Sequence, residues 1–269
     1  MINEGFLNPL PRVVAHRGDS KHFPENTIEA FLSAVEMNID VIETDVHLSK
    51  DNVVVIWHDE TLDRNTDGTG RIEDHSLEEL LEFDAGYTFT KDGGKTYPFR
   101  AKGVKLCTLE EALVKCPNQR FNIDLKTNNL KIVDEFIKLV KRLKAEHRVC
   151  CASFHLSNLQ AVREKSPDIL TSVTTKEVVP MLFKQKLGIL PKKLANRKII
   201  FQVPVSQGII KVITRRFIKM MHDRGAIIMV WTINDEKEME RLFKMGVDSI
   251  MSDDPTTVIK VAKKLNIRS

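Results

Sequence analysis

The chain has 269 residues, of which 42% are hydrophobic and 29% charged, and its formal net charge is +4. These values are typical of a soluble globular protein, and so small a net charge does not by itself indicate a nucleic-acid-binding protein. Because the N-terminus lacks the pattern of a signal peptide and no 18-residue apolar stretch follows, we expect a cytoplasmic protein without a transmembrane helix.

Segments with strand-like and helix-like hydrophobic spacing alternate along most of the chain. Strands are expected at 13–16, 41–48, 53–57, 121–125, 148–154, 169–173, 199–203, 227–231 and 249–251. Helices are expected at 26–38, 109–114, 130–146, 156–165, 209–224, 235–244 and 256–265. Repeated β-α units of this length predict an α/β protein with a (β/α)8 TIM barrel, and an open doubly wound sheet is the alternative.

The stretch 60–107 interrupts this alternation after the second strand. It contains two turn signals, Asp67-Gly68-Thr69-Gly70 and Asp92-Gly93-Gly94-Lys95. We therefore interpret 60–107 as a small insertion in the barrel. The chain shows no linker or low-complexity run, so we expect 1–269 to form one domain.

Charged and aromatic side chains stand where the predicted strands end. In parallel β/α barrels the working residues lie at the C-terminal ends of the strands. We therefore expect one rim of the barrel to carry the following side chains: His16, Arg17, Glu43, Asp45, His58, Asp124, Lys126, Phe154 and Trp231.

Three of these side chains are carboxylates. Glu43 and Asp45 are two residues apart on a strand and share a face, and Asp124 belongs to the same rim. Buried carboxylates repel one another, and a hard cation such as Mg²⁺ or Ca²⁺, which prefers oxygen ligands, would compensate. The alternative is that these acids form salt bridges with Arg17 or Lys126.

The remaining polar residues of the rim suit chemistry on a phosphate. His16 and His58 are candidates for an acid–base pair, because an imidazole titrates close to neutral pH. Arg17 and Lys126 would stabilise the negative charge of a phosphodiester. The glycine-rich loop of a kinase is missing, so phosphodiester cleavage is favoured over phosphoryl transfer from a nucleotide.

Several segments together resemble the glycerophosphodiester phosphodiesterase family, and the stretch 178–222 resembles its lysophospholipid-cleaving branch. The order and spacing of these segments match the family pattern over nearly the whole chain. They are Ala15-His16-Arg17-Gly18, Pro24-Glu25-Asn26-Thr27, Glu43-Thr44-Asp45, Trp57-His58-Asp59, Asp124-Leu125-Lys126, Trp231-Thr232-Ile233-Asn234 and Ser252-Asp253-Asp254-Pro255.

The resemblance implies metal-dependent hydrolysis of glycerophosphodiesters to glycerol 3-phosphate and an alcohol such as choline. It implies that Glu43, Asp45 and Asp124 bind Mg²⁺ or Ca²⁺, with Asp124 standing where many members carry the longer Glu. It further implies that the substrate's own hydroxyl attacks phosphorus, with one histidine as base and the other as acid. We assign His16 as the base and His58 as the acid.

The resemblance gives further roles around this centre. Arg17 and Lys126 would bind the phosphate. Phe154 and Trp231, which stand at strand ends, are candidates to line the substrate pocket, and the alternative for both is ordinary barrel packing. Glu25 and Asn26 would support the residues that react, or would simply cap the helix that follows them.

The stretch 178–222 contains ten Lys or Arg and no Asp or Glu. The simplest interpretation is a solvated helix face beside core residues. The alternative is a peripheral contact with an anionic membrane, which would suit lysophospholipids as additional substrates.

Other functions fit the pattern less well. Another barrel phosphodiesterase, such as a phospholipase C or a sphingomyelinase D-like enzyme, would also carry histidines at its rim. A non-catalytic lipid- or phosphate-binding barrel would have little use for so many like charges. A nucleic-acid binder is disfavoured, because few aromatic residues stand among the basic ones.

Overall fold

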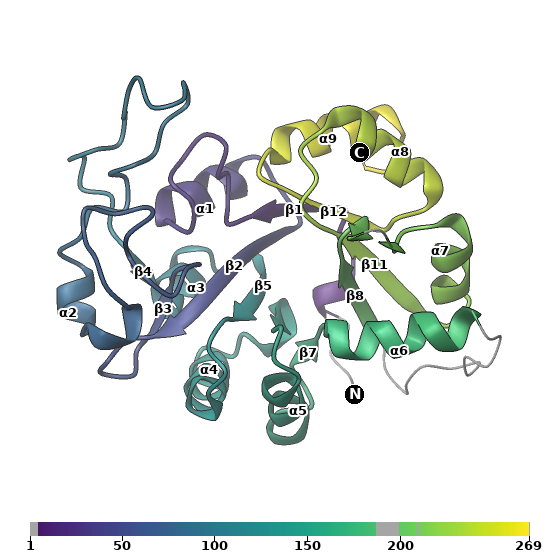
Figure 1. Cartoon of the computed structure of the whole chain (residues 1–269), viewed down its shortest axis with the longest axis horizontal. Coiled ribbons are helices and arrows are strands. Elements are labelled where there is room, and N and C mark those ends of the chain that lie inside the picture. The colour runs from purple at the N-terminus through teal and green to yellow at the C-terminus, as the bar shows by residue number, and fades with distance from the viewer. Residues whose placement is uncertain (1–4, 187–198, 209, 269) are drawn as a thin grey trace.

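The computed structural model describes residues 5–186, 199–208 and 210–268, and its centre is a closed parallel sheet (Figure 1). Eight strands follow one another around it in the order β7-β6-β5-β2-β1-β12-β11-β8. A parallel bridge from Ser172 to Ile200 joins the two ends of this order. The strands are β1 (Val13–His16), β2 (Val41–Leu48), β5 (Arg120–Leu125), β6 (Val149–Ala152), β7 (Leu170–Thr171), β8 (Ile199–Val203), β11 (Ala226–Val230) and β12 (Ser249–Ser252).

Helices cover the outside of this barrel, each following a strand. They are α1 (Ile28–Glu36), α3 (Leu109–Lys115), α4 (Leu130–Arg142), α5 (Leu156–Lys165), α6 (Thr175–Lys186), α7 (Arg215–His222), α8 (Glu236–Met245) and α9 (Pro255–Lys264). Several begin at a side-chain cap that satisfies a free backbone N–H, such as Thr27 before α1 and Asp235 before α8. The predicted barrel, with an addition after its second strand, is confirmed.

Alternation along the strands divides the apolar residues between two cores. Val14 and Met229 point into the barrel, where the 3-10 helix η1 (Gly5–Leu7) adds Phe6. Their neighbours along the strands point outward and pack under the helices, as Phe121 does against Phe31 of α1. The barrel interior is therefore filled with side chains at the N-terminal ends of the strands, and only the C-terminal rim can receive a substrate.

The segment between β2 and α3 forms a structure of its own beside the barrel (Figure 1, left). It contains β3 (Val54–Ile56), the 3-10 helix η2 (Ile72–Asp74), α2 (Leu77–Leu80) and β4 (Cys107–Thr108). Strand β3 is antiparallel to both β2 and β4. Its own apolar core includes Leu62, Ile72 and Leu80, whereas Val54 and Ile56 of β3 and Cys107 of β4 belong to the main core.

The region 178–222 differs from the prediction. Helix α7 begins at Arg215 and not near 209, because β10 (Ile210–Lys211) pairs with β9 (Ser206–Gln207) and Thr214 then caps the helix. Helix α6 was not predicted. Residues 187–198 and 209 of the basic stretch lie outside the described residues. Within the described parts, no helix is both long and apolar enough to cross a bilayer.

Candidate active site

The residues predicted at the strand ends share one side of the barrel wall. Val41 packs inside the barrel, so the alternation along β2 turns Glu43 and Asp45 to the same inner face. The register between neighbouring strands places His16 beside Glu43 and Asp45 beside Asp124. One pocket at this rim is lined by nine of the eleven predicted site residues: His16, Arg17, Glu43, Asp45, His58, Asp124, Lys126, Phe154 and Trp231.

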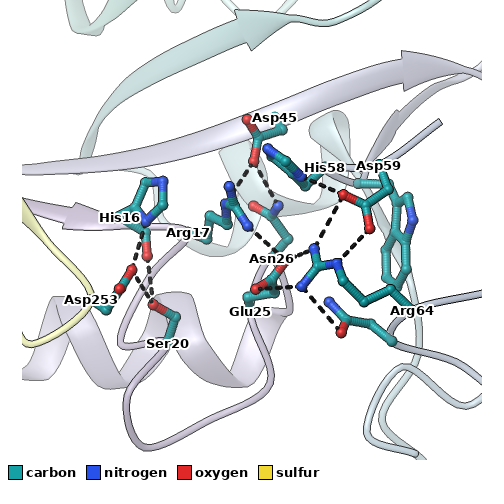
Figure 2. Close-up of polar contacts among 12 residues, drawn as sticks. His16, Arg17, Ser20, Glu25, Asn26, Asp45, His58, Asp59, Arg64 and Asp253 are labelled. Carbon is teal, nitrogen blue, oxygen red and sulfur yellow. Dashed lines mark hydrogen bonds and ion pairs between the residues drawn. The ribbon is translucent and has the colours of Figure 1, made fainter. Parts of the chain in front are cut away.

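His16 ends β1 and is oriented by a carboxylate from the far end of the chain. Its Nδ1 lies 2.6 Å from Asp253 Oδ1 (Figure 2). Asn234 Nδ2 donates to the other oxygen of Asp253 at 2.6 Å. Burial alone would lower the pKa of His16, but the hydrogen bond to Asp253 and the charge of Glu43 raise it above its ordinary value. This imidazole is therefore biased toward its protonated form.

His58 has a similar partner but the opposite bias. It follows β3, and its Nδ1 lies 2.6 Å from Oδ1 of Asp59 (Figure 2). Burial lowers the pKa of His58 below its ordinary value, and the nearby cations Arg17 and Lys126 act in the same direction. A neutral imidazole that donates from Nδ1 leaves Nε2 as a proton acceptor.

Arg17 is held by its backbone as well as by its side chain. Its φ is +57°, and the following Gly18 has a φ of +83° and no room for a Cβ, which would lie 2.8 Å from Ala30. The guanidinium contacts Glu25 at 2.9 Å and lies 3.2 Å from Oδ2 of Asp45, the latter without hydrogen-bond alignment. The sharp turn after β1 therefore directs this cation toward the pocket.

Glu25 and Asn26 lie behind the pocket wall, where they contact the residues that line it. Asn26 donates to Asp45 Oδ2 at 3.0 Å and accepts from Thr44 Oγ1 at 2.7 Å. Glu25 pairs with Arg17. The capping alternative is wrong for both residues, because the cap of α1 is Thr27, whose hydroxyl accepts from the backbone N–H of Ala30.

The three carboxylates are neutralised unequally. Lys126 Nζ lies 2.8 Å from an oxygen of Asp45 and 2.8 Å from an oxygen of Asp124, so the salt bridges of the alternative interpretation are present. Burial alone would raise the pKa of Asp45, but Lys126 and Arg17 hold it below its ordinary value. Burial and the neighbouring charge of Asp45 raise the pKa of Glu43 to about 7.

The donor set fits a hard cation in its chemistry. It offers carboxylate oxygens, and Oδ1 of Asp124 is buried without a hydrogen-bond partner. Burial raises the pKa of Asp124, and the positive charge of Lys126 offsets this effect only in part. Among the described residues, no three acids or histidines are already gathered around one point as a preformed metal centre. Metal binding would therefore have to compete with Lys126 for Asp45 and Asp124.

An aromatic pair forms the apolar side of the pocket. Phe154 and Trp231 pack edge to face, with ring centroids 6.2 Å apart. Lys126 Nζ lies 5.8 Å from the centre of the Phe154 ring. Phe154 is 57% exposed, which is unusual for a large apolar side chain and places it at the edge of the pocket.

Two interactions in the site were not predicted from the sequence. The last predicted strand ends near Asp253, which places it at the same rim, but the sequence does not indicate that Asp253 orients His16. Asn122 and Gln202 exchange two hydrogen bonds, of 3.3 and 2.6 Å, on the pocket floor. The pairing of β5 with β6 and the pairing of β8 with β11 do not bring these two amides together; only the closed barrel does.

The sequence matches a family model over nearly its whole length. The model is that of the glycerophosphoryl diester phosphodiesterase family, and it covers residues 16–257. A glycerophosphodiester phosphodiesterase from Caldanaerobacter subterraneus is 34% identical over 258 residues, which are 94% of this chain and 98% of the relative.

Solved structures agree with this match. The glycerophosphoryl diester phosphodiesterase domain of a Mycobacterium tuberculosis protein has a TM-score of 0.82 at 21% identity, covering 94% of this chain and 99% of that one. An Oleispira antarctica phosphodiesterase in complex with the product sn-glycerol 3-phosphate has a TM-score of 0.77 at 26% identity, covering 95% of this chain and 98% of that one.

Proposed function

Because the chain belongs to the glycerophosphoryl diester phosphodiesterase family, we propose that it hydrolyses glycerophosphodiesters to glycerol 3-phosphate and an alcohol such as choline or ethanolamine. It is accordingly a phosphoric diester hydrolase. The bound product of the Oleispira antarctica relative supports glycerol 3-phosphate as the product here.

One observation carries this proposal: two carboxylate-oriented histidines line the same pocket as Arg17. In each histidine Nδ1–H donates a hydrogen bond to the carboxylate, so Nε2 is the nitrogen left to act on a substrate. Arg17 supplies fixed positive charge for a phosphate, and Lys126 adds a second cation. This set of groups suits cleavage of a phosphodiester with one proton accepted and one donated.

The pKa directions favour particular roles for the histidines in this proposal. His58, with its lowered pKa, is suited to take the proton of the substrate hydroxyl that attacks phosphorus. His16, with its raised pKa, is suited to protonate the leaving alcohol. This assignment is the reverse of the one made from the sequence.

The proposal includes a divalent cation, Mg²⁺ or Ca²⁺, with Glu43, Asp45 and Asp124 as its ligands. Its support is the oxygen-only donor set and the unpaired Oδ1 of Asp124. When bound, such an ion would stabilise the negative charge that develops on the phosphate oxygens. Lys126, once released from Asp45 and Asp124, would be free to contact the phosphate.

Histidine variants test the assignment of the active site. We expect His16→Ala and His58→Ala each to lower kcat for glycerophosphocholine by roughly 10²- to 10⁴-fold, because each removes a positioned acid or base. Release of glycerol 3-phosphate and choline is the measurement. His22→Ala is the matched control, since His22 also has an aspartate on Nδ1, at 2.8 Å, but is not among the pocket-lining residues.

Either histidine would be removed from the mechanism if its alanine variant turned over at the rate of His22→Ala. A panel of other phosphodiesters completes the test. Cleavage of a sphingomyelin or of a phosphatidylinositol in preference to glycerophosphocholine would favour the alternative barrel phosphodiesterases.

Lysophospholipids are a second proposed substrate class. The supporting observation is the aromatic pair, which gives the pocket an apolar edge with Phe154 largely exposed. We expect Phe154→Ala to raise KM for lysophosphatidylcholine more than KM for glycerophosphocholine, because only the former carries an acyl chain. Equal changes for the two substrates would argue against an acyl-binding role.

A further inference from the structure

Arg64 connects the two loops that carry the candidate catalytic groups. It belongs to the segment between β2 and α3, yet its guanidinium reaches Glu25 in the loop after β1 and Asp59 in the loop after β3 (Figure 2). Nη2 lies 2.6 Å from Glu25 Oε1, and Nε lies 2.5 Å from Asp59 Oδ2. Two longer contacts, of 3.4 Å to Glu25 and 3.3 Å to Asp59, complete a fork on each carboxylate.

Both carboxylates also hold a residue of the pocket, and Oε1 of Glu25 accepts from Arg64 and Arg17 at once. Asp59 accepts from His58 Nδ1, and Glu25 pairs with Arg17. Polar contacts therefore run without a break from His58 through Asp59, Arg64 and Glu25 to Arg17, with Arg64 in the middle (Figure 2). Burial alone would raise the pKa of Asp59, but Arg64 and His58 hold it below its ordinary value, so Asp59 stays ionised.

The backbone beneath Arg64 is fixed, so its side chain starts from a defined position. An antiparallel bridge joins Thr61 to Arg71, and the carbonyl of Thr61 accepts from the indole of Trp57 at 2.9 Å. Leu62 is fully buried in the core of this segment. The guanidinium therefore connects a fixed point of this packed segment to the loops at the rim of the barrel.

We propose that Arg64 is a positioning residue, which holds His58 in its working orientation through Asp59 and holds Arg17 through Glu25. A lysine could not replace it, because an ammonium cannot present the planar fork that contacts both carboxylates at once. The inference rests on the proposed function, since it assumes that His58 and Arg17 act on the substrate.

The matched control comes from the same segment. Arg71 is 49% exposed against 46% for Arg64, and it also lies between two acids, Glu60 and Glu73. Neither of those acids contacts a pocket residue in the described parts of the chain. Arg64→Met and Arg71→Met each remove an arginine that pairs with two acids, but Glu60 and Glu73 are more exposed than Glu25 and Asp59. The thermal unfolding of both variants is therefore compared along with their turnover.

The first test is kinetic. We expect Arg64→Met to lower kcat/KM for glycerophosphocholine by roughly 10- to 100-fold, which is the usual cost of losing an orienting partner. The misplaced His58 lowers kcat, and the misplaced Arg17 raises KM. Arg64→Lys recovers only part of this loss, and Arg71→Met stays close to wild type. In protein that already carries both Asp59→Asn and Glu25→Gln, adding Arg64→Met lowers kcat/KM little further.

Wild-type turnover by Arg64→Met, or an equal loss in both backgrounds, would overturn the inference. Thermal unfolding of each variant verifies that it is folded, which we expect because the Arg64 side chain is 46% exposed and Glu25 keeps its pair with Arg17.

The second test needs no turnover, so it separates this inference from the proposed function. Nitrogen NMR of histidine-labelled protein, with His58→Gln for assignment, reports the tautomer of His58. We expect a single Nδ1–H form in wild type and in Arg71→Met, and a mixture of tautomers in Arg64→Met. An unchanged His58 signal in Arg64→Met would contradict the inference, whereas an inactive wild type would contradict only the proposed function.

Discussion

At the scale of single residues, the carboxylates of the site differ in whether a cation lies beside them. Asp45 is paired with both Lys126 and Arg17, whereas Glu43 has no cation within hydrogen-bonding distance of its carboxylate among the described side chains. Among the described basic side chains, His16 lies within salt-bridge range of Glu43, at 3.9 Å. The positions of these residues could be predicted from strand alternation, but this inequality could not, since it depends on the side-chain conformations of Lys126 and Arg17.

Because Glu43 is buried with no described cation within hydrogen-bonding distance, the stability of the protein should depend on pH in a way that can be measured without metal. The folded protein holds the proton of Glu43 up to about pH 7, whereas the unfolded chain releases it near 4.5. Between these values the folded state binds more protons, so its free energy of unfolding falls as the pH rises, by a contribution on the order of a few kcal/mol. We expect Glu43→Gln to abolish this fall, measured by urea unfolding in the presence of chelator.

Glu111→Gln, which alters an exposed glutamate paired with Lys115, is the control and retains the wild-type dependence. If Glu43→Gln lost stability with pH as steeply as this control, Glu43 would not be the group responsible.

At the scale of elements, the segment between β2 and α3 has a small core of its own and brings His58 to the pocket. Its core residues Leu62, Ile72 and Leu80 are all fully buried or nearly so. His58 and Arg64 both depend on this packing for their positions. The turn signals in the sequence predicted an insertion here, but they did not indicate that it has a core.

A cavity in this small core should loosen the segment before the barrel. We expect Leu80→Ala to destabilise it by about 2 to 5 kcal/mol, and hydrogen exchange to rise in residues 54–106 while the barrel strands stay protected. Leu159→Ala in α5 creates a comparable cavity in the main core. It should increase exchange across the barrel instead, and the same pattern in both variants would contradict separate packing.

The helices show where sequence patterns suffice and where they do not. Helix α5 was predicted with its observed ends, Leu156 and Lys165. Helix α6 was missed, because it contains Pro180, a residue that removes a backbone donor from a helix interior. The start of α7 was placed too early, because Ile210–Lys211 continues the apolar pattern but pairs with a strand. Tertiary pairing, which spacing does not encode, decided that boundary.

At the scale of the whole molecule, we propose that 1–269 act as one domain with 60–107 as its insertion. The site supports this proposal, because it draws on the first strand and the last one. His16 of β1 is oriented by Asp253, which follows β12, and those strands are neighbours in the closed sheet. The barrel could be predicted from β-α alternation, but the contact between the two ends of the chain requires closure.

The proposed membrane contact also belongs to the whole molecule. The described part of 178–222 presents Arg215 and Arg216 as exposed cations on α7. We expect Arg215→Glu with Arg216→Glu to reduce co-sedimentation with anionic vesicles, because the attraction is electrostatic. Lys131→Glu with Lys138→Glu on α4 makes the same change in charge elsewhere and should have little effect. Equal binding of the unaltered protein to anionic and neutral vesicles would refute the contact.

The most direct test of the central claim is turnover of glycerophosphocholine by the unaltered chain with Mg²⁺, with Ca²⁺ and with chelator. We predict that glycerol 3-phosphate and choline are released in equal amounts, that chelator stops the release and that one of the two ions restores it, because Glu43, Asp45 and Asp124 need a cation that Lys126 supplies only in part. Undiminished release in chelator would contradict the proposed metal dependence, and no release under any of these conditions would contradict the proposed activity.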